Sequence, residues 1–352
     1  MILNFALIIL GIALLVWAAD RFTDGAAAVA RNFGVSPMII GLTIIAIGSS
    51  APEIIVSIVA AFNGEPELAI GNALGSNITN IAFVVGITAF ILPLQVESKV
   101  IKREFPILFL VTITAGLLMS DLQLTTFDGI VLLVTLVIYI AWLITIGIQS
   151  SKAKEQDRMI EELVDELPDS MSNQKAAGLI VIGAILLGIS SQILVYGATQ
   201  IAREFGVSEL IIGLTIVALG TSLPELAASV AGVLKNDHEM AIGNIIGSNI
   251  FNLLAVLGIP GIIASTQLES TVVYRDFLVM FALTVALFLM AYGLRGPGRI
   301  NRLEGGVLAA AYVGYLILLY FQEVPKSQQP EKQYSQAYST LFSEPANRIY
   351  NG

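Results

Sequence analysis

Two glutamates differ from the other acidic residues of this sequence because they lie well inside apolar segments. Glu53 lies within residues 36–62 and Glu225 within residues 208–234, whereas the other acids are expected in loops, at helix ends or in the C-terminal tail. An ionised carboxylate is costly in an apolar layer unless it is paired or hydrated, and no Lys or Arg lies inside these segments. The sequence therefore favours a bound cation as their partner. The alternative is a pair of protonated glutamates that hydrogen-bond between helices.

A helix-breaking sequence precedes each glutamate, GSSAP at 48–52 and GTSLP at 220–224. Proline lacks a backbone donor, so we expect nearby carbonyls, those of Ala46 and Ala218, to be free to coordinate ions. Unwound backbone is tolerated at membrane depth only where it lines a cavity or is buried in protein. The alternative reading of these Gly and Ser residues is a packing face between helices.

Further oxygen ligands follow in GSNITN at 75–80 and GSNIFN at 247–252. Residues four apart share a helix face, which groups Ser76 with Asn80 and Ser248 with Asn252. Asn77 and Asn249 lie on a neighbouring face, and we expect them to be structural. Ca²⁺ takes about six to eight oxygen ligands of these kinds, whereas Zn²⁺ and Cu⁺ prefer nitrogen and sulfur. The residues therefore predict a site for a hard cation such as Ca²⁺ or Na⁺.

The composition places this site in a membrane protein. Of the 352 residues, 56% are hydrophobic and 13% are charged, against about 25% charged in soluble domains, and the mean hydropathy is +0.82. These values exclude an ordinary soluble enzyme. The net charge of −9 argues against nucleic acid as a partner, and the absence of cysteine excludes disulfides and thiolate metal sites.

Membrane-spanning helices need roughly 20 mostly apolar residues. Ten segments qualify: 2–19, 36–62, 66–92, 104–120, 127–148, 176–197, 208–234, 238–264, 277–293 and 305–321. The second, third, seventh and eighth are interrupted near their middles by Gly, Ser, Pro or Asn, so we expect discontinuous helices there.

An internal repeat relates the two halves of the chain. Residues 33–86 and 205–258 match at 28 of 54 positions without gaps, at an offset of 172 that superposes Glu53 on Glu225. Equivalent helices are five spans apart, so the copies cross the membrane in opposite directions. Secondary transporters with such inverted repeats bind substrates near the bilayer midplane, between broken helices of the two halves. We therefore predict an all-α polytopic membrane protein of two inverted five-helix repeats.

The chain divides into two halves, a linker and a tail. Residues 1–148 form the first half, with its repeat at about 33–92, and residues 176–321 form the second, with its repeat at about 205–264. The linker at 149–175 is acidic, and the tail at 322–352 is polar. With the N-terminus outside, thirteen Lys and Arg fall in inside loops and two in outside loops. Basic residues favour the cytoplasmic side, so we expect a cytoplasmic linker and both termini outside, in a cell (inner) membrane.

The paired motifs G-[ST]-S-x-P-E and G-N-x-x-G-S-N-x-x-N resemble the alpha-repeats of sodium/calcium exchangers in the calcium/cation antiporter superfamily, in its compact prokaryotic form. The resemblance covers both halves. It implies exchange of Ca²⁺ for Na⁺ by alternating access, without a cofactor, at a cluster of one Ca²⁺ site and neighbouring Na⁺ sites. The ligands that it implies are Glu53, Glu225, Asn80, Asn252, Ser49, Ser50, Thr221, Ser222, Ser76, Ser248 and the carbonyls of Ala46 and Ala218. Asn252 stands where potassium-dependent relatives have Asp, which argues against K⁺ co-transport.

Three other functions compete with this one. A Ca²⁺/H⁺ antiporter is the nearest, because glutamates can also release protons. A cation channel is less favoured, since channels usually place rings of like subunits around an axial pore. An enzyme is least favoured, because no nucleophile–base pair is visible. The expected partners are Ca²⁺, Na⁺ and the lipid bilayer, and we expect a functional monomer.

Overall fold

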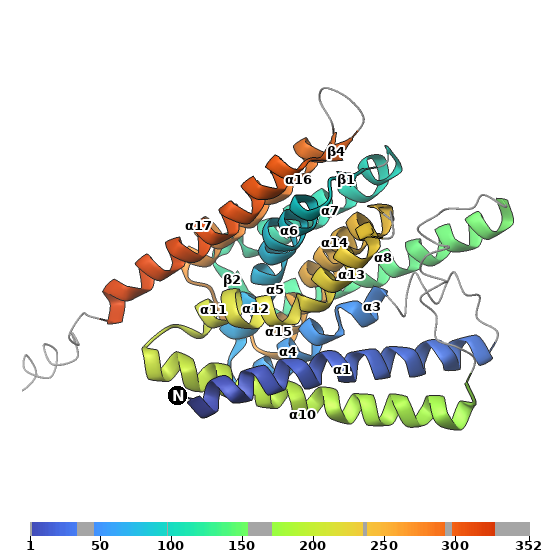
Figure 1. The fold of residues 1–352 in the computed structure, drawn as a ribbon. Helices are drawn as coiled ribbons and strands as arrows, with labels where there is room; N and C mark the ends of the chain where they lie inside the picture. Colours follow the sequence, from blue (N-terminus) through green and yellow to red (C-terminus); the bar gives the residue numbers. More distant parts are fainter. Residues whose placement is uncertain are drawn as a thin grey trace, which may run out of the picture.

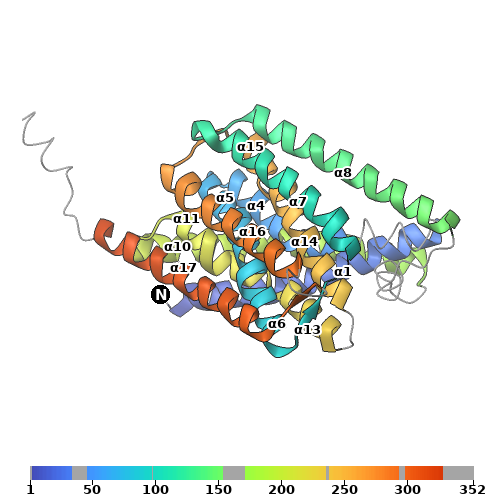
Figure 2. The same ribbon diagram turned by 90° about the horizontal axis from the view of Figure 1, so that it is seen from above.

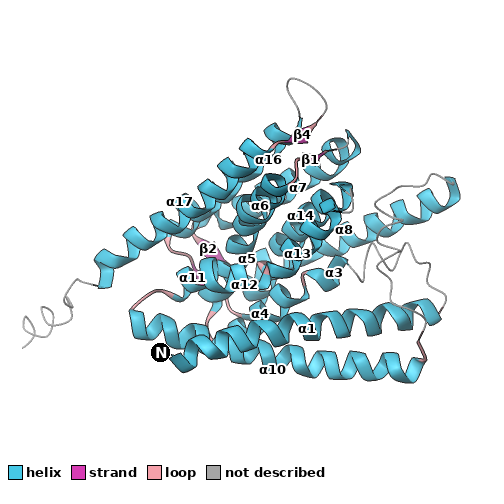
Figure 3. Cartoon of the chain, in the orientation of Figure 1, coloured by secondary structure: helices cyan, strands magenta, loops and turns pink. Residues whose placement is uncertain are grey.

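The computed structural model describes residues 2–33, 46–96, 98–153, 171–234, 238–292 and 298–327, and most of them are helical (Figures 1 and 3). Within these ranges nine helices are long and apolar enough to cross a membrane: Ile2–Asn32, Pro66–Ile91, Ile101–Asp121, Thr126–Thr145, Asn173–Phe205, Glu209–Leu234, Ala241–Ile263, Val272–Tyr292 and Arg302–Gln322. The second predicted span, 36–62, is described only from residue 46. With it, the helices follow the predicted ten-helix plan.

The first half comprises α1 (Ile2–Asn32), α3 (Ala46–Ser49), α4 (Ala51–Phe62), α5 (Pro66–Ile78), η2 (Thr79–Val85), α6 (Gly86–Ile91), β1 (Leu94–Gln95), α7 (Ser98–Leu118), η3 (Met119–Asp121), β2 (Gln123–Leu124) and α8 (Thr126–Ala153). The second half comprises α10 (Asn173–Phe205), α11 (Glu209–Ile212), η4 (Gly213–Val217), α12 (Ala218–Thr221), α13 (Leu223–Leu234), α14 (His238–Phe251), η5 (Asn252–Val256), α15 (Gly258–Ile263), β3 (Thr266–Gln267), η6 (Val272–Phe277), α16 (Leu278–Tyr292), β4 (Arg299–Ile300) and α17 (Arg302–Ser327).

Several helices run past the ends of their apolar segments. α1 continues to Asn32 and α10 to Phe205, whereas the sequence predicts ends at 19 and 197. α8 and α17 likewise extend into the predicted linker and tail. Residues 154–170 of the linker and 328–352 of the tail lie outside the described residues. Helical backbone bonding does not stop where the apolar stretch stops, so hydropathy alone underestimates these lengths.

The second and seventh helices break at equivalent positions. α3 ends before Ser50, whose φ and ψ are −91° and 7°, and α12 ends before Ser222, with −86° and 5°. These angles lie in the sparsely populated region between helix and strand. Pro52 and Pro224 follow in the first turn of α4 and α13, where proline costs little because its missing N–H has no intrahelical acceptor. Both predicted breaks are therefore present.

The third and eighth helices change in another way. Instead of unwinding, each widens into a π-helical stretch, η2 after α5 and η5 after α14. Such stretches are rare and often lie at functional sites. They begin next to Asn80 and at Asn252, so the change in backbone geometry coincides with two of the predicted ligands.

Two short antiparallel strand pairs reveal the symmetry between the halves. β1 pairs with β4, opposing Leu94 to Ile300, and β2 pairs with β3, opposing Leu124 to Thr266. Each pair joins the end of the third helix of one half to the start of the last helix of the other half. The halves are therefore connected reciprocally.

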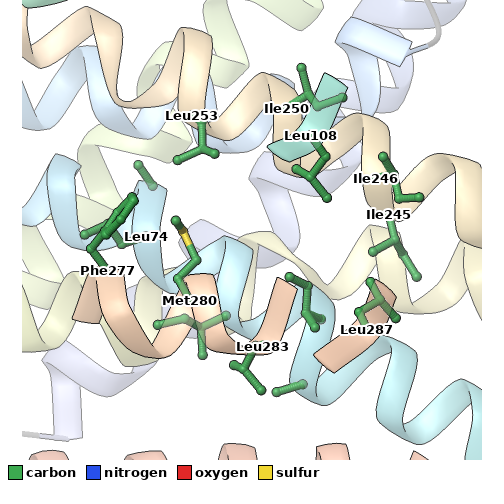
Figure 4. Close-up of a cluster of buried hydrophobic side chains, with 14 of the residues drawn as sticks. Leu74, Leu108, Ile245, Ile246, Ile250, Leu253, Phe277, Met280, Leu283 and Leu287 are labelled. Atoms are coloured by element: carbon green, nitrogen blue, oxygen red, sulfur yellow. The ribbon is translucent and has the colours of Figure 1, made fainter. Parts of the chain in front are cut away.

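The third and eighth helices form the centre of the molecule. In their apolar windows 78% and 83% of residues are buried, against 28% in the fifth and tenth helices, which expose apolar side chains outward. Residues of both halves belong to one apolar core between these helices, among them Leu74, Leu108, Ile246 and Met280 (Figure 4). The site-bearing segments are thus enclosed by the outer helices.

Helices α1 and α10 lie side by side and form a separate layer against α4 (Figure 1). They approach closely at Gly11, where a Cβ atom would meet the backbone nitrogen of Leu194 at 2.9 Å. In Figures 1 and 2 the N-terminus and the end of α17 lie at one end of the helix bundle, and the end of α8 lies at the other. The end of α8 therefore lies at the opposite end of the bundle from the start of α1 and the end of α17.

Candidate ion-binding site

Glu53 and Glu225 come together from the two repeats. Their side chains are 0% and 1% exposed and interact electrostatically with each other. Each lies in the first turn of the helix that follows a break. The first turn of a helix has N–H groups without intrahelical partners and a dipole that favours negative charge. The breaks thus allow carboxylates to be held at this depth.

These carboxylates have few protein partners. The ion pairs in the described part of the chain involve other acids. Ser248 Oγ donates to Glu225 Oε1 at 3.3 Å. The other three carboxylate oxygens, both of Glu53 and the Oε2 of Glu225, accept no hydrogen bond from the described residues. Buried polar atoms without partners are costly and uncommon in native proteins. A cation between the carboxylates would satisfy them.

The predicted hydroxyl ligands divide into available and occupied groups. Ser50 and Ser222, at the two breaks, are buried and have no hydrogen-bond partner among the described residues. Ser49 is half-buried at the end of α3. Ser76 Oγ donates to Asn72 Oδ1 at 3.4 Å, and Thr221 Oγ1 donates to the same oxygen at 3.3 Å. A hydroxyl that donates one hydrogen still has oxygen lone pairs for a cation.

The carbonyl of Ala218, one of the two predicted backbone ligands, accepts a hydrogen bond in this conformation. Its oxygen accepts the N–H of Ser222 at 3.1 Å and lies 3.3 Å from Thr221 Oγ1. The single hydroxyl hydrogen of Thr221 also has the carbonyl of Val217 and Asn72 Oδ1 within reach, so the Ala218 oxygen retains a lone pair for a cation. A proline removes the bond to the carbonyl four residues earlier. For Pro224 that carbonyl belongs to Gly220, which accepts the N–H of Ser222 instead. Ala46, the equivalent of Ala218, is the first residue of α3.

The two predicted amide ligands lie where the π-helical stretches begin. Asn80 Nδ2 donates to Asn249 Oδ1 at 3.2 Å, and its Oδ1 has no partner among the described residues. Neither amide atom of Asn252 has such a partner. Both side chains are completely buried. Their oxygens are therefore available to a cation.

Sequence reasoning missed Asn72, a fully buried residue of α5 that connects several of these groups. Its Nδ2 donates to the backbone carbonyl of Glu53 at 3.2 Å and to Ser57 Oγ at 3.3 Å. Its Oδ1 accepts from Ser76 and Thr221, so it links residues of both repeats. Its spacing could have identified it, because it lies four residues before Ser76 on the same helix face.

Three further acids are buried, although the sequence predicts them at helix ends: Glu104, Asp128 and Asp276. Unlike Glu53, they have partners. Arg275 bonds Asp276 at 2.7 and 2.9 Å, and Tyr315 donates to it at 2.7 Å. Arg103 donates to Glu104 at 2.6 Å. No cluster of three or more Asp, Glu, His or Cys that could hold a metal occurs in the described ranges. The central site therefore combines two carboxylates with neutral oxygens.

The fold and the site define the class of this protein. Two inverted five-helix halves enclose a pair of buried carboxylates, one from each half, and this arrangement is that of a secondary transporter of cations. The chain matches the sodium/calcium exchanger protein family over residues 3–145 and 175–321. It therefore belongs to this family of membrane antiporters, whose members are transporters and not enzymes.

Individual relatives match nearly the whole chain. CaxA of Alkalimonas amylolytica, a proposed antiporter, is 50% identical over 313 residues, which cover 89% of this chain and 97% of CaxA. The inner membrane protein YrbG of Escherichia coli K12 is 38% identical over 321 residues, 91% of this chain and 98% of YrbG. A solved structure of the sodium-calcium exchanger NCX_Mj, soaked with Na⁺ and Sr²⁺, matches with a TM-score of 0.60 and 31% identity over 90% of this chain and 98% of that chain.

Proposed function

We propose that this protein exchanges Ca²⁺ for Na⁺ across the membrane by alternating access. The observation that carries the proposal is the pair of buried carboxylates, Glu53 and Glu225, whose oxygens lack a basic partner in the described part of the chain. A protein that binds and releases cations needs such a pair, because a permanent Lys or Arg partner would compete with the ion. The sodium-calcium exchanger NCX_Mj, with its similar fold, supports the choice of ions.

The ligand set of this proposal consists of the two carboxylates and the oxygens around them. The side chains are Glu53, Glu225, Asn80, Asn252, Ser49, Ser50, Thr221, Ser222, Ser76 and Ser248. Carboxylate, amide and hydroxyl oxygens suit both Ca²⁺ and Na⁺. The backbone carbonyls of Ala46 and Ala218 complete the set, and that of Ala218 also accepts the N–H of Ser222 in the described conformation.

Charge balance relates the two ions. When Glu53 and Glu225 are ionised, the site carries two negative charges, which one Ca²⁺ or two Na⁺ neutralise. A third Na⁺ would leave a positive charge on the loaded site, so its transport would make the exchange electrogenic. The membrane potential would then act directly on the exchange.

Exchange of Ca²⁺ for protons is the second candidate. It is favoured by one observation: Glu53 and Glu225 are buried without a basic partner among the described residues, and each could carry a proton out as Ca²⁺ enters. Since the same residues serve both reactions, only transport measurements separate them.

The orientation follows from charge. By the sequence, thirteen Lys and Arg fall between the predicted spans on the linker side and two on the opposite side, which favours a cytoplasmic linker and external termini in a cell membrane. The end of α8 lies at the opposite end of the bundle from the start of α1 and the end of α17, which supports this arrangement (Figure 1). We further propose that one chain is sufficient for exchange, because both carboxylates come from the same chain.

The test is uptake of radioactive Ca²⁺ into proteoliposomes loaded with Na⁺, compared with K⁺-loaded vesicles under an imposed pH gradient. The proposal expects rapid Ca²⁺ uptake into Na⁺-loaded vesicles, driven by the outward Na⁺ gradient, and little Ca²⁺ uptake into K⁺-loaded vesicles. Glu53→Gln serves as the inactive control. Uptake that follows the pH gradient without Na⁺ would instead establish Ca²⁺/H⁺ exchange.

A further inference from the structure

Four buried asparagines form two symmetry-related sets at the centre of the protein. Asn77 and Asn80 in the first repeat correspond to Asn249 and Asn252 in the second, at the offset of 172. All four are at most 1% exposed. Asn80 and Asn252 belong to the proposed ligand set, whereas Asn77 and Asn249 lie on the neighbouring face of the same helices.

One of the two equivalent bonds between these sets is made. Asn80 Nδ2 donates to Asn249 Oδ1 at 3.2 Å, across the boundary between the repeats. This bond uses the nitrogen of the Asn80 amide. An amide held through its nitrogen directs its oxygen elsewhere, and Asn80 Oδ1 has no partner among the described residues. Asn249 therefore holds Asn80 in an orientation that leaves its oxygen available to a cation.

The symmetry-related bond is not made. It would join Asn252 Nδ2 to Asn77 Oδ1, and within the described residues both atoms lack a hydrogen-bond partner. Asn77 Nδ2 donates instead to Met280 Sδ at 3.4 Å, and a thioether sulfur is a weak acceptor. Asn252 is thus not held by an amide. Rotated, it would present its NH₂ group, which does not bind cations.

The repeat equivalent of Met280 is Leu108, which offers no acceptor (Figure 4). Asn249 Nδ2 accordingly has no partner in the described part of the chain. The two halves therefore differ in a specific contact, although their sequences at these four positions are the same. Such a difference is the expected mark of one state of an inverted-repeat protein, because the halves adopt different conformations at any moment.

We propose that Asn249 and Asn77 are positioning residues that act in turn. In the described state Asn249 orients Asn80. In the oppositely facing state Asn77 leaves Met280 and orients Asn252, while the Asn80–Asn249 bond opens. The inference rests on the proposed function, since it requires an ion site exposed alternately on two faces. A contact made in only one of two states biases the equilibrium between them and affects ion binding in that state alone.

The test measures the half-saturating Ca²⁺ concentration of Na⁺-driven exchange on each face separately, in right-side-out and inside-out membrane vesicles. Asn249→Ala should raise it about three- to tenfold on one face only, and Asn77→Ala by a similar factor on the opposite face, as the loss of one hydrogen bond predicts. The maximal rates should change less. Thr112→Val and Thr284→Val are matched controls, because these buried hydroxyls bond only to carbonyls of their own helices. Both control variants should leave the half-saturating Ca²⁺ concentration unchanged on the two faces.

The proposal is overturned if the two variants raise the half-saturating Ca²⁺ concentration on the same face, if each raises it equally on both faces, or if neither changes it. Asn249→Ser and Asn77→Ser, which keep a polar group but not the reach of the amide, provide the same readout if the alanine variants do not fold. Exchange by the wild-type protein distinguishes a failure of this inference from a failure of the proposed function. If the wild type shows no Na⁺-driven Ca²⁺ exchange, the proposed function fails. If it exchanges and the variants show no sidedness, only the role of these asparagines fails.

Discussion

Replacement of Asn72 by leucine should destabilise the protein and impair exchange together, because this one side chain connects both repeats. Leucine is similar in size, so the substitution removes hydrogen bonds without opening a large cavity. Four hydrogen bonds disappear, two donated and two accepted. The neighbours of Asn72 differ in the hydrogen bonds that they keep after the substitution, and this difference determines how far the free energy of unfolding falls.

Thr221 keeps bonds to the carbonyls of Val217 and Ala218, and Ser57 keeps the carbonyl of Ala69. The hydroxyl of Ser76 loses its only acceptor in the described part of the chain. A buried group left without a partner costs about 1–3 kcal/mol, and a typical hydrogen bond contributes about 0.5–1.5 kcal/mol. With partial replacement of the other bonds, the free energy of unfolding should fall by about 2–5 kcal/mol.

Thermal unfolding of the purified protein in detergent tests the first expectation, and Na⁺-driven Ca²⁺ uptake tests the second. Uptake should fall even in the folded fraction, because Ser76 and Thr221 lose the acceptor that orients them. Thr284→Val is the control, since it removes a buried hydroxyl bonded only to its own helix. If Asn72→Leu unfolds no earlier than this control and transports at the wild-type rate, the connection through Asn72 has no energetic importance.

Three other predictions follow from the site and the topology. Glu53→Gln and Glu225→Gln should each abolish Ca²⁺ flux while the yield of folded protein stays near wild type, and a near-normal flux in either variant would make that glutamate structural. Asn252→Asp should make exchange more sensitive to pH between about 6 and 9 and responsive to K⁺, because a third carboxylate beside two others favours retention of a proton. An unchanged pH profile at the wild-type rate would place Asn252 outside the ion cluster. Cysteines introduced singly at Ser151 and Gln328 should react with impermeant thiol reagents from opposite sides, and labelling from one side would refute the topology.

The sequence alone determined the class of protein, the ten-helix plan and the inverted repeat. Each depends on features of the sequence that can be recognised without knowledge of the tertiary structure. Apolar length reports a membrane span, and an odd number of spans between repeat copies fixes their relative direction. The two central glutamates could be recognised in the same way, because an acid inside an apolar segment is conspicuous in any fold.

Helix ends and local geometry were less accessible to sequence reasoning. α1 and α10 continue well past their apolar segments, because helical hydrogen bonding does not require apolar side chains. The interruptions predicted for the third and eighth helices take the form of π-helical stretches rather than breaks. Hydropathy does not distinguish between these backbone geometries.

Only the tertiary structure decided which polar atoms of the site are satisfied. Asn72 meets Thr221, 149 residues away, and Asn80 meets Asn249, 169 residues away. Whether the Ala218 carbonyl is free depends likewise on how Ser222 and Thr221 turn at the break. The equivalent residues Asn80 and Asn252 have the same local sequence and yet different partners. The physical reason is that a hydrogen bond depends on distances of a few tenths of an ångström between packed helices, and in an inverted-repeat protein the packing differs between the halves while the residues do not.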